Sequence, residues 1–454
     1  MELRVCVLAA GQGKRMNSDL PKVMHPLAGK PMIDHVLDTA REVAAAPAVV
    51  VYGHGGEVLQ KHLASRPLVW AEQRQQLGTG HAVAQALPAL PPDCFVLILY
   101  GDVPLLSANT LKRLVEAGQE SGFALLTVNL TDPAGYGRII RDARGEVSAI
   151  VEHGDADTSV RAICEVNTGV LALRGEYLHR WLPKLGTHNA QGEFYLTDCV
   201  AMAAAEGIRV ASVMAASEAE VLGVNTRSQL AFLERIYQRH AADALMAQGV
   251  TVIDPARLDI RGSLRCGRDV VIDVNAVFEG NVELGDGVHI GPNCVIRESI
   301  LGTGTRVLPN CVIEEAHIGP NGRIGPFSRV RPETRLGRDV HIGNFVEIKK
   351  STIEDGSKVN HLAYIGDAEI GRDVNVGAGT ITCNYDGAHK HKTIIEDEAF
   401  IGSDTQLVAP VKIGRGATVG AGTTVTEDVE PGRLVISRVR QKTIAGYQRP
   451  RKEK

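Results

Sequence analysis

Between residues 263 and 430 an aliphatic residue recurs about every six positions, often with a glycine directly after it. The pattern is seen in Ile290-Gly291, Ile318-Gly319, Ile342-Gly343, Ile365-Gly366 and Ile401-Gly402. A helix requires apolar spacings of three and four, and an ordinary strand alternates by two, so neither explains a period of six. A hexad repeat is typical of a parallel β-helix, in which each hexad forms one short flat face and a turn.

The repeat also predicts the core of this domain. Three hexads make a coil of about 18 residues, and coils stack at the strand spacing of about 4.8 Å. Val, Ile and Leu then point inward above one another, which agrees with an aromatic content of only 4%. Gly and Asn at the corners permit tight turns. We expect about nine coils between residues 263 and 430, within an all-β domain that spans residues 249–454.

Residues 1–227 alternate short apolar runs with segments of helical spacing. The runs at 3–9, 48–52 and 95–99 are typical of buried strands, and Ile33, Val36, Leu37 and Ala40 between them keep helical spacing. This pattern predicts a Rossmann-like α/β domain, with a mostly parallel sheet and helices on both faces. Ligands in such sheets bind beyond the carboxyl ends of the strands. Residues 228–248 keep helical spacing and predict a linker helix.

A glycine-rich segment, LAAGQGKRM at 8–16, follows the first predicted strand, and Lys22 comes shortly after it. Glycines let the backbone approach phosphates closely, and Arg15 and Lys22 supply positive charge. The segment is not a Walker A loop, because Lys14 is followed by Arg15. Met16 stands where the dinucleotide fingerprint has its third glycine, which disfavours a dehydrogenase.

An acidic residue, Asp102, follows the apolar run 95–99 and should emerge at the carboxyl edge of the sheet. Carboxylates in that place are good magnesium ligands, although a turn or helix-capping acid is the structural alternative.

Composition excludes several classes of partner. The net charge of −4 gives no overall field that attracts nucleic acid or a membrane surface. No run of 18 apolar residues and no signal peptide is found. Eight cysteines lack C-x-x-C spacing, which predicts reduced thiols in a cytoplasmic protein.

The hexad repeat is interrupted or carries unusual polar residues at a few places, and we expect the catalytic and binding residues there. The clearest break is CNYDGAHKHKT at 383–393, a loop ejected from the coils. Arg331, Lys349, His361 and Tyr364 flank inward aliphatic residues, so they should point outward, and their spacings allow one cluster on an outer groove. Such basic groups require an anionic ligand, and a neutral imidazole suits a general base. A zinc site from His289, His317 and His341 is disfavoured because these residues fall at unrelated phases of the repeat.

The motifs LAAGQGKRM, LPK, QLGTGHA, YGDVP, GYGR, VEH and NTG together resemble those of sugar-nucleotide pyrophosphorylases. With the hexad domain behind them, residues 3–447 resemble the bifunctional bacterial enzymes that make UDP-N-acetylglucosamine. The resemblance implies two activities. The C-terminal domain would acetylate glucosamine 1-phosphate with acetyl-CoA. The N-terminal domain would then transfer UMP from UTP to N-acetylglucosamine 1-phosphate, releasing pyrophosphate and supplying peptidoglycan and lipopolysaccharide synthesis.

The same resemblance implies the N-terminal site residues. Arg15 and Lys22 would bind the triphosphate and serve catalysis, and Asp102 and Asn225 would ligate Mg²⁺. The remaining nucleotide and sugar contacts are expected at Leu8, Ala9, Ala10, Gly11, Gln73, Gly78, Thr79, Tyr100, Gly101, Gly137, Glu152 and Asn167. Lys14 departs from the family pattern, which usually has Thr at that position.

In the C-terminal domain the resemblance implies a left-handed β-helix that forms homotrimers, with acetyltransferase sites at subunit interfaces. His361 would be the general base, with Glu347 as its orienting acid. The amino-sugar phosphate is expected at Arg331, Lys349, Tyr364 and Asn375. Acetyl-CoA is expected at Ala378, Asn384, Tyr385, Ser403, Ala421 and Arg438, with Asn384 and Tyr385 also near the sugar. Arg440 stands where the family often has Pro. The alternative is a nucleotidyltransferase whose β-helix serves only as an oligomerisation scaffold.

Overall fold

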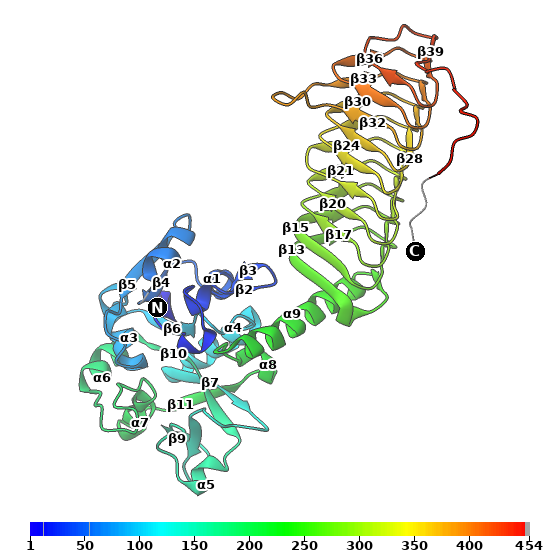
Figure 1. Ribbon diagram of the computed structural model, residues 1–454. Coiled ribbons are helices and arrows are strands. Elements are labelled where there is room, and N and C mark those ends of the chain that lie inside the picture. Colours follow the sequence, from blue (N-terminus) through cyan, green and yellow to red (C-terminus); the bar gives the residue numbers. More distant parts are fainter. Residues whose placement is uncertain (12, 54, 450–454) are drawn as a thin grey trace. The chain divides into compact units, whose positions relative to one another are not determined.

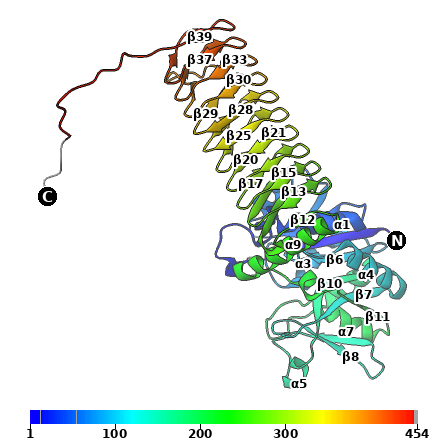
Figure 2. The ribbon, with the colours of Figure 1, turned by 90° about the vertical axis from the view of Figure 1, so that its right-hand side faces the viewer.

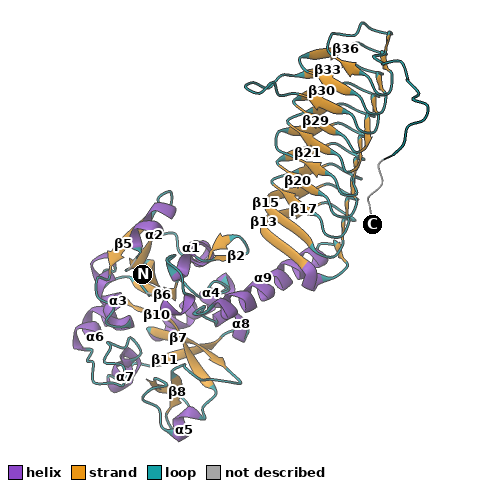
Figure 3. Ribbon diagram, in the orientation of Figure 1, coloured by secondary structure: helices purple, strands orange, loops and turns teal. Residues whose placement is uncertain are grey.

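The computed structural model describes residues 1–11, 13–53 and 55–449. The chain forms two compact units, Met1–Tyr237 and Gln238–Lys454, and helices are concentrated in the first while strands make up most of the second (Figure 3). No helix in the described ranges is long and apolar enough to span a membrane.

The first unit is built on a twisted sheet with the strand order β11-β7-β10-β6-β1-β4-β5. Its strands run parallel except β10, which is antiparallel to both β6 and β7. The hairpin β8–β9 joins the sheet through β10. The strands are β1 (Leu3–Ala9), β4 (Ala48–Tyr52), β5 (Leu68–Glu72), β6 (Phe95–Tyr100), β7 (Phe123–Asn129), β8 (Arg138–Arg141), β9 (Val147–Val151), β10 (Glu165–Arg174) and β11 (Val210–Met214).

Helices cover both faces of this sheet because alternate residues of each strand point to opposite sides. In β1, Val5 and Val7 belong to one buried cluster, whereas Cys6 and Leu8 belong to the other. The helices are α1 (Met32–Val43), α2 (Gly56–His62), α3 (Thr79–Ala86), α4 (Ala108–Ser121), α5 (Thr158–Arg161), α6 (Gly175–Trp181), α7 (Asp198–Ala205) and α8 (Glu218–Val221). A small hairpin, β2 (Pro26–Leu27) and β3 (Lys30–Pro31), precedes α1.

The sheet has a topological switch point beside β1. The chain proceeds from β1 to β4 and β5 on one side, and then returns to β6 on the other side of β1. The loops that follow β1 and β6 therefore diverge and leave a crevice at the carboxyl edge, as the sequence predicts.

Helix α9 (Arg227–Ala247) contributes to the core of each unit. Its Leu233 is buried with Met16 and Met32 in the first unit. Farther along, Ala242 and Leu245 join the core of the second unit, and the Gln238 amide exchanges two hydrogen bonds with the Ile260 backbone at 2.7 and 2.8 Å.

The second unit is a parallel β-helix (Figures 1 and 2). One face, here called sheet C, consists of β12 (Thr251–Val252), β14 (Val271–Ile272), β16 (His289–Ile290), β19 (Arg306–Val307), β22 (Arg323–Ile324), β25 (His341–Asn344), β28 (Lys358–His361), β31 (Asn375–Val376), β34 (Phe400–Ile401), β37 (Thr418–Val419) and β39 (Leu434–Val435).

The other two faces form one continuous sheet, here called sheet D, because its first strands bend around a corner. Its strands are β13 (Leu258–Cys266), β15 (Ala276–Leu284), β17 (Val295–Arg297), β18 (Ile300–Leu301), β20 (Val312–Glu314), β21 (Ala316–Ile318), β23 (Arg329–Val330), β24 (Thr334–Leu336), β26 (Glu347–Lys349), β27 (Thr352–Ile353), β29 (Tyr364–Gly366), β30 (Ala368–Ile370), β32 (Ile381–Cys383), β33 (Thr393–Ile395), β35 (Gln406–Val408), β36 (Val411–Ile413) and β38 (Thr424–Val425).

The core of the β-helix is the stack that the hexads predict. Ile290, Val307, Ile324, Ile342 and Val359 are paired from coil to coil and are at most 2% exposed. The paired coils begin at β12, before residue 263. The sequence pattern does not detect these first coils because they lack the Ile-Gly pairs by which a repeat is recognised.

The phase of the repeat is not constant. Ile290 pairs with Val307 and Ile324 with Ile342, so coils of 17 and 18 residues alternate irregularly. The shorter coils place His289 and His341 at the same outward position of sheet C, three coils apart, whereas His317 lies in sheet D. The expectation that these histidines fall at unrelated phases is therefore wrong for His289 and His341.

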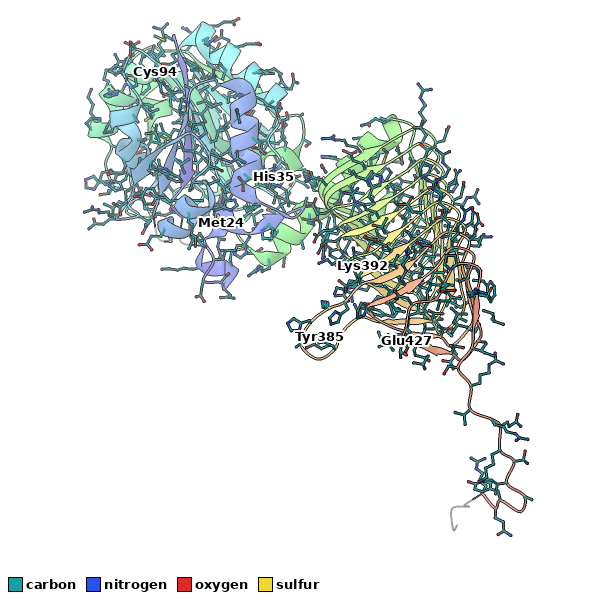
Figure 4. The ribbon with its side chains drawn as sticks, turned by 90° about the horizontal axis from the view of Figure 1, so that it is seen from above. Met24, His35, Cys94, Tyr385, Lys392 and Glu427 are labelled. Carbon is teal, nitrogen blue, oxygen red and sulfur yellow. The ribbon has the colours of Figure 1, made fainter. Side chains whose placement is uncertain are left out.

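The break in the repeat is an ejected loop between β32 and β33. Coil-to-coil pairing resumes from Ala368 to Thr393, a separation of 25 residues. Tyr385 and Lys390 form a small antiparallel bridge inside the loop, and the loop stands clear of the stacked coils with Tyr385 on it (Figure 4).

Candidate functional site

A cavity of about 350 Å³ lies at the carboxyl ends of β1 and β6 in the first unit. It gathers most of the residues expected there. Its lining comprises Leu8, Ala9, Ala10, Gly11, Lys22, Val23, Gln73, Gln76, Gly78, Thr79, Ala82, Tyr100, Asp102, Glu193 and Asn225. Gln12 of the glycine-rich segment lies outside the described residues.

The charged centre of this cavity is Lys22. Its ammonium forms an ion pair with Asp102 and donates a hydrogen bond to Asn225 Oδ1 at 3.1 Å. Both charged side chains are about nine-tenths buried, with 13% and 14% exposed. The backbone N–H of Val224 donates to the Asp102 carbonyl at 2.9 Å, which fixes the two loops together.

The two oxygens that meet the Lys22 ammonium suit a divalent cation. A carboxylate and an amide oxygen are ligands that Mg²⁺ prefers, and Mg²⁺ commonly takes its remaining ligands from water and substrate phosphates. In the described part of the chain no group of three or more His, Cys, Asp or Glu side chains could hold a metal. With Asp102 and Asn225 alone, a bound Mg²⁺ would take its remaining ligands from water and a phosphorylated ligand.

Another part of the cavity wall is formed by Gln73 and the turn before α3. Gln73 is buried, and its Nε2 donates to the Gly78 carbonyl at 3.1 Å. Gly78 has φ of 111°, and a Cβ there would lie 2.6 Å from the Phe194 carbonyl oxygen. Only glycine fits this position, which lets the turn pack directly against the Phe194 backbone.

Arg15 lies in a short 3₁₀ segment, Lys14–Met16, and does not line the cavity. Its side chain is exposed and makes no hydrogen bond or ion pair with the residues that the structure describes. The guanidinium is thus available to a phosphate that extends out of the cavity. Gly101 is buried, and a Cβ there would meet Ile33 at 2.9 Å, so this glycine permits close packing beneath the cavity.

The residues expected to hold the sugar lie together at β8–β10. The Asn167 backbone N–H donates to the Gly137 carbonyl at 2.8 Å. A Cβ on Gly137 would lie 3.2 Å from Glu152 Oε1, which accepts a hydrogen bond from Thr197 Oγ1 at 3.0 Å. Burial raises the pKa of Glu152.

In the second unit, one outward position of sheet D carries alternating charges along successive coils. The residues of this "paired column" are Arg261, Glu279, Arg297, Glu314 and Arg331. Arg261 pairs with Glu279 at 2.9 Å, and Arg297 pairs with both Glu279 and Glu314. The next position would continue the alternation with an acid, but Lys349 stands there.

The break in alternation leaves an excess of positive charge. Arg331 Nη1 pairs with Glu347 at 2.7 Å, while its buried Nε has no hydrogen-bond partner in the described residues. Lys349 lies 3.8 Å from Asp367, which also accepts a hydrogen bond from Asn384. An anion placed here would satisfy the orphaned donor and the unbalanced ammonium.

The ejected loop adds a third cation to the same place. Contact with Lys349 and repulsion from its charge lower the pKa of Lys390, whereas Asp367 and Tyr364 act in the opposite direction. Asn384 Nδ2 lies 3.4 Å from the Tyr364 hydroxyl. Lys349, Tyr364, Asn384 and Lys390 therefore form one cluster.

His361 ends strand β28 of sheet C and is exposed. Its Nδ1 contacts Asn344 Oδ1 at 2.9 Å, one coil below. An N–H at Nδ1 would donate to that oxygen and leave the lone pair on Nε2, which suits a base. Glu347, the acid expected to orient His361, forms its ion pair with Arg331. The side chain that contacts the His361 ring is that of Asn344.

Small residues continue the His361 position along the next coils. The register of sheet C places Ala378, Ser403 and Ala421 above His361. Arg438 lies at the far end and donates to the Ala421 carbonyl at 3.1 Å. His361 is thus the first large side chain at the end of a row of small ones.

Comparison with known proteins places the chain in a family. Residues 5–166 match the family described as MobA-like NTP transferase domain, 260–342 match the GMPPB C-terminal domain, and 392–427 match the bacterial transferase hexapeptide. The "Bifunctional protein GlmU" of Azoarcus sp. (strain BH72) is 60% identical, with 100% of both chains covered. Those of Cupriavidus pinatubonensis and Nitrosospira multiformis are 57% and 56% identical, covering 99% and 100% of this chain and 99% and 98% of theirs.

The chain belongs to the GlmU family of bifunctional proteins.

This membership confirms the expected fold class, with an N-terminal nucleotidyltransferase domain and a C-terminal hexapeptide-repeat domain whose parallel coils are consistent with a left-handed β-helix. The chain is a bifunctional transferase, with a uridyltransferase and an acetyltransferase in one polypeptide. The alternative of a nucleotidyltransferase with a β-helix that is only a scaffold does not hold.

Two solved structures are also similar to the chain. A nucleotidyl transferase from Methanothermobacter thermautotroptrophicus shows 21% identity and a TM-score of 0.38, covering 53% of this chain and 99% of that one. A UDP-glucose pyrophosphorylase complexed with UDP-glucose shows 17% identity and a TM-score of 0.45, covering 53% and 100%.

The structure separates residues that the sequence suggested as one cluster in this GlmU-family protein. Arg331 and Lys349 occupy one column of sheet D and lie near Tyr364, whereas His361 and Asn375 lie on sheet C. Among the described residues no hydrogen bond or ion pair joins the two groups.

Sequence reasoning missed Asn344, Asp367, Thr197, Glu193 and Lys390 as site residues. Asn344 and Asp367 are brought to the site by coil-to-coil register, which depends on the coil lengths. The sequence did contain a signal for Asp367. This acid directly follows the Ile365-Gly366 pair, at a position where it can form an ion pair with Lys349.

Proposed function

We propose that the cavity beside β1 and β6 binds UTP and N-acetylglucosamine 1-phosphate, and that residues 1–227 carry the uridylyl transfer. A sugar phosphate oxygen attacks the α-phosphorus of UTP, the bond to the β,γ-diphosphate breaks, and pyrophosphate leaves. The nucleophile is already an anion, so no general base is required. Catalysis here is positioning and charge neutralisation.

The roles of the chain's own residues follow from their places. Lys22 neutralises charge inside the cavity, and exposed Arg15 reaches the outer phosphates. Gln73 and the Gly78–Thr79 turn hold the base and ribose with Leu8, Ala9, Ala10 and Gly11. Glu152, Gly137 and Asn167 hold the amino sugar. Mg²⁺ held by Asp102 and Asn225 would supply further stabilisation of phosphate charge.

We propose that residues 249–454, joined through the helical linker 228–248, acetylate glucosamine 1-phosphate. Arg331 and Lys349 bind the phosphate, and Tyr364 and Asn375 contact the sugar. His361 Nε2 removes a proton from the amine as its nitrogen attacks the thioester carbonyl, and the CoA thiolate leaves. Ala378, Ser403 and Ala421 leave room for the pantetheine, with Asn384, Tyr385 and Arg438 as further CoA contacts.

The observation that carries this assignment is Lys349 in the paired column. A purely structural column would continue with an acid, since like charges opposite one another destabilise a sheet. The excess cation and the orphaned Arg331 Nε are what a phosphate dianion requires.

A paired assay tests both assignments on the full chain. Acetyl-CoA with glucosamine 1-phosphate should release free CoA, and UTP with N-acetylglucosamine 1-phosphate should release pyrophosphate. Chelation of divalent cations should abolish the second reaction. Absence of either reaction with its substrates would contradict the corresponding assignment.

We propose that the chain is a homotrimer with acetyltransferase sites at subunit interfaces. Phe327 and Phe345 stack with ring centroids 5.4 Å apart, although they are 51% and 56% exposed. Both have positive φ, as does exposed Leu362 in the next coil. Bulky residues rarely take that conformation, and an exposed apolar strip beside Asn344 and His361 supports an interface there. Light scattering that finds a monomer at micromolar concentration would contradict the trimer.

A further inference from the structure

The outward position of sheet C carries five basic residues on five successive coils. These are His289, Arg306, Arg323, His341 and Lys358, here called the basic column. All are exposed except His341, which is half-buried. Successive members are separated by one strand spacing, about 4.8 Å between backbones.

The side chains of the basic column are not paired with acids as those of the paired column are. Among the described residues, none of its side chains takes part in a hydrogen bond or an ion pair. The paired column of sheet D has the same geometry, yet there each Arg alternates with a Glu. The fold can therefore pair its charges in this arrangement, and on sheet C it does not.

Charged neighbours in this column, such as Arg306 and Arg323, repel each other in the folded chain. Two unit charges about 5 Å apart repel by roughly 0.8 kcal/mol even in water. The effect reaches His341, whose pKa is lowered by burial and then by the charges of Lys358 and Arg323, with only Asp339 opposing them. An anion from outside the chain would relieve this repulsion.

The position of the basic column identifies that anion. Lys358 and His361 belong to the same strand, and His341 shares β25 with Asn344. Above Lys358 the outward residues become Asn375, Phe400, Thr418 and Leu434, so the positive charge ends at the coil of His361. The row of small residues proposed for acetyl-CoA extends from His361 in that upper direction.

The coils below His361 also carry the residues proposed to bind the sugar phosphate. Arg323 lies in the coil of Arg331, and His341 lies in the coil of Lys349. The basic column on sheet C thus spans the same coils as the phosphate-binding pair on sheet D, on the side of His361 away from the row of small residues.

We propose that the basic column is an electrostatic track that draws glucosamine 1-phosphate dianions to the acetyltransferase site. The inference rests on the acetyl transfer proposed above and adds how its acceptor arrives. A surface of one sign raises the local concentration of an oppositely charged substrate and its association rate by about 10- to 10³-fold, and salt suppresses the effect.

The test is the double variant Arg306→Gln/Arg323→Gln in the full-length protein. Its kcat/KM for glucosamine 1-phosphate should fall by about 3- to 10-fold at low ionic strength, with kcat unchanged at saturation. Its kcat/KM should depend less on salt than that of the wild type, so the two should converge at high salt.

A matched control changes net charge equally elsewhere on the β-helix. Arg335→Gln/Arg372→Gln removes two exposed arginines that lie outside the basic column. This variant should keep the wild-type kcat/KM and salt dependence.

Three results would contradict the proposal that the basic column is an electrostatic track. They are an unchanged salt dependence in Arg306→Gln/Arg323→Gln, an equal loss in the control variant, or a change of oligomeric state that makes the column an interface. A wild-type protein that does not acetylate glucosamine 1-phosphate would instead refute the proposed function.

Discussion

Lys349 marks the place where the charge pattern of the β-helix departs from structural pairing. Below it, each Arg of the paired column meets a Glu. At Lys349 the nearest carboxylate is 3.8 Å away and is shared with Asn384. The residue is therefore explained by a ligand better than by stability.

Lys349→Met separates these two explanations. Loss of a charge-assisted contact with phosphate should raise KM for glucosamine 1-phosphate by at least about 10-fold. The melting temperature should change little, because the variant also removes repulsion from Lys390. Arg297→Met, the matched change inside the paired column, should lower stability and leave KM unaltered. A large fall in the stability of Lys349→Met would make it a structural residue.

His361→Ala tests the proposed base. A positioned base contributes about 10²–10⁴-fold, so acetyl transfer should fall by at least about 10²-fold. The side chain is exposed, so its removal opens no cavity in the core. Raising the pH should partly rescue the variant because more of the amine is then uncharged. Near-wild-type acetyl transfer at neutral pH would exclude His361.

Glu152→Gln tests whether the buried carboxylate of the proposed sugar site lowers the stability of the folded chain. Burial raises the pKa of Glu152, so ionisation of this carboxyl is unfavourable in the folded state. The cost is present above the folded pKa and absent below the unfolded pKa. The variant should therefore melt higher than wild type at pH 7, with a difference that shrinks toward pH 4, while uridylyl transfer weakens. An equal or lower melting temperature at pH 7 would contradict this reading.

At the scale of elements, the ejected loop depends on one acid. Asp386 accepts hydrogen bonds from the backbone of His389 at 2.7 Å and Ala388 at 2.8 Å, and it pairs with His391 at 2.6 Å. These contacts, the His389 backbone bond first, hold the pKa of Asp386 well below its usual range. They bring Lys390 back toward Lys349.

Asp386→Asn should loosen the loop without harming the coils. We expect faster amide hydrogen exchange at 384–392, weaker acetyl transfer and unchanged uridylyl transfer. The wild-type loop should loosen likewise only in strong acid, because a depressed carboxyl pKa keeps its contribution until the pH falls through it. Unchanged exchange in the loop would show that other contacts hold it.

The elements that sequence reasoning recovers are those set by local pattern. Ile342 and Val359 are inward residues because the hexads place them there, and the β1–β6 crevice follows from strand order. The sequence does not reveal contacts that depend on coil length. A one-residue slip decides whether Asn344 or another residue lies beneath His361, and it aligns His289 with His341.

At the scale of the molecule, two chemistries that share a sugar phosphate reside on two separately packed units. Each unit has its own buried core and its own candidate site. The acetylated product of one site is the acceptor of the other, and we expect it to pass between them by diffusion.

The central claim is that the two activities depend on different residues, Asp102 in the first unit and His361 in the second. Full-length Asp102→Asn and His361→Ala should be assayed for both reactions, alone and mixed. Asp102→Asn should lose at least about 10²-fold of uridylyl transfer and keep acetyl transfer, and His361→Ala should show the reverse. The mixture, given glucosamine 1-phosphate, acetyl-CoA and UTP, should make UDP-N-acetylglucosamine that neither variant makes well alone. Loss of both activities in either variant, or a mixture without product, would contradict the account.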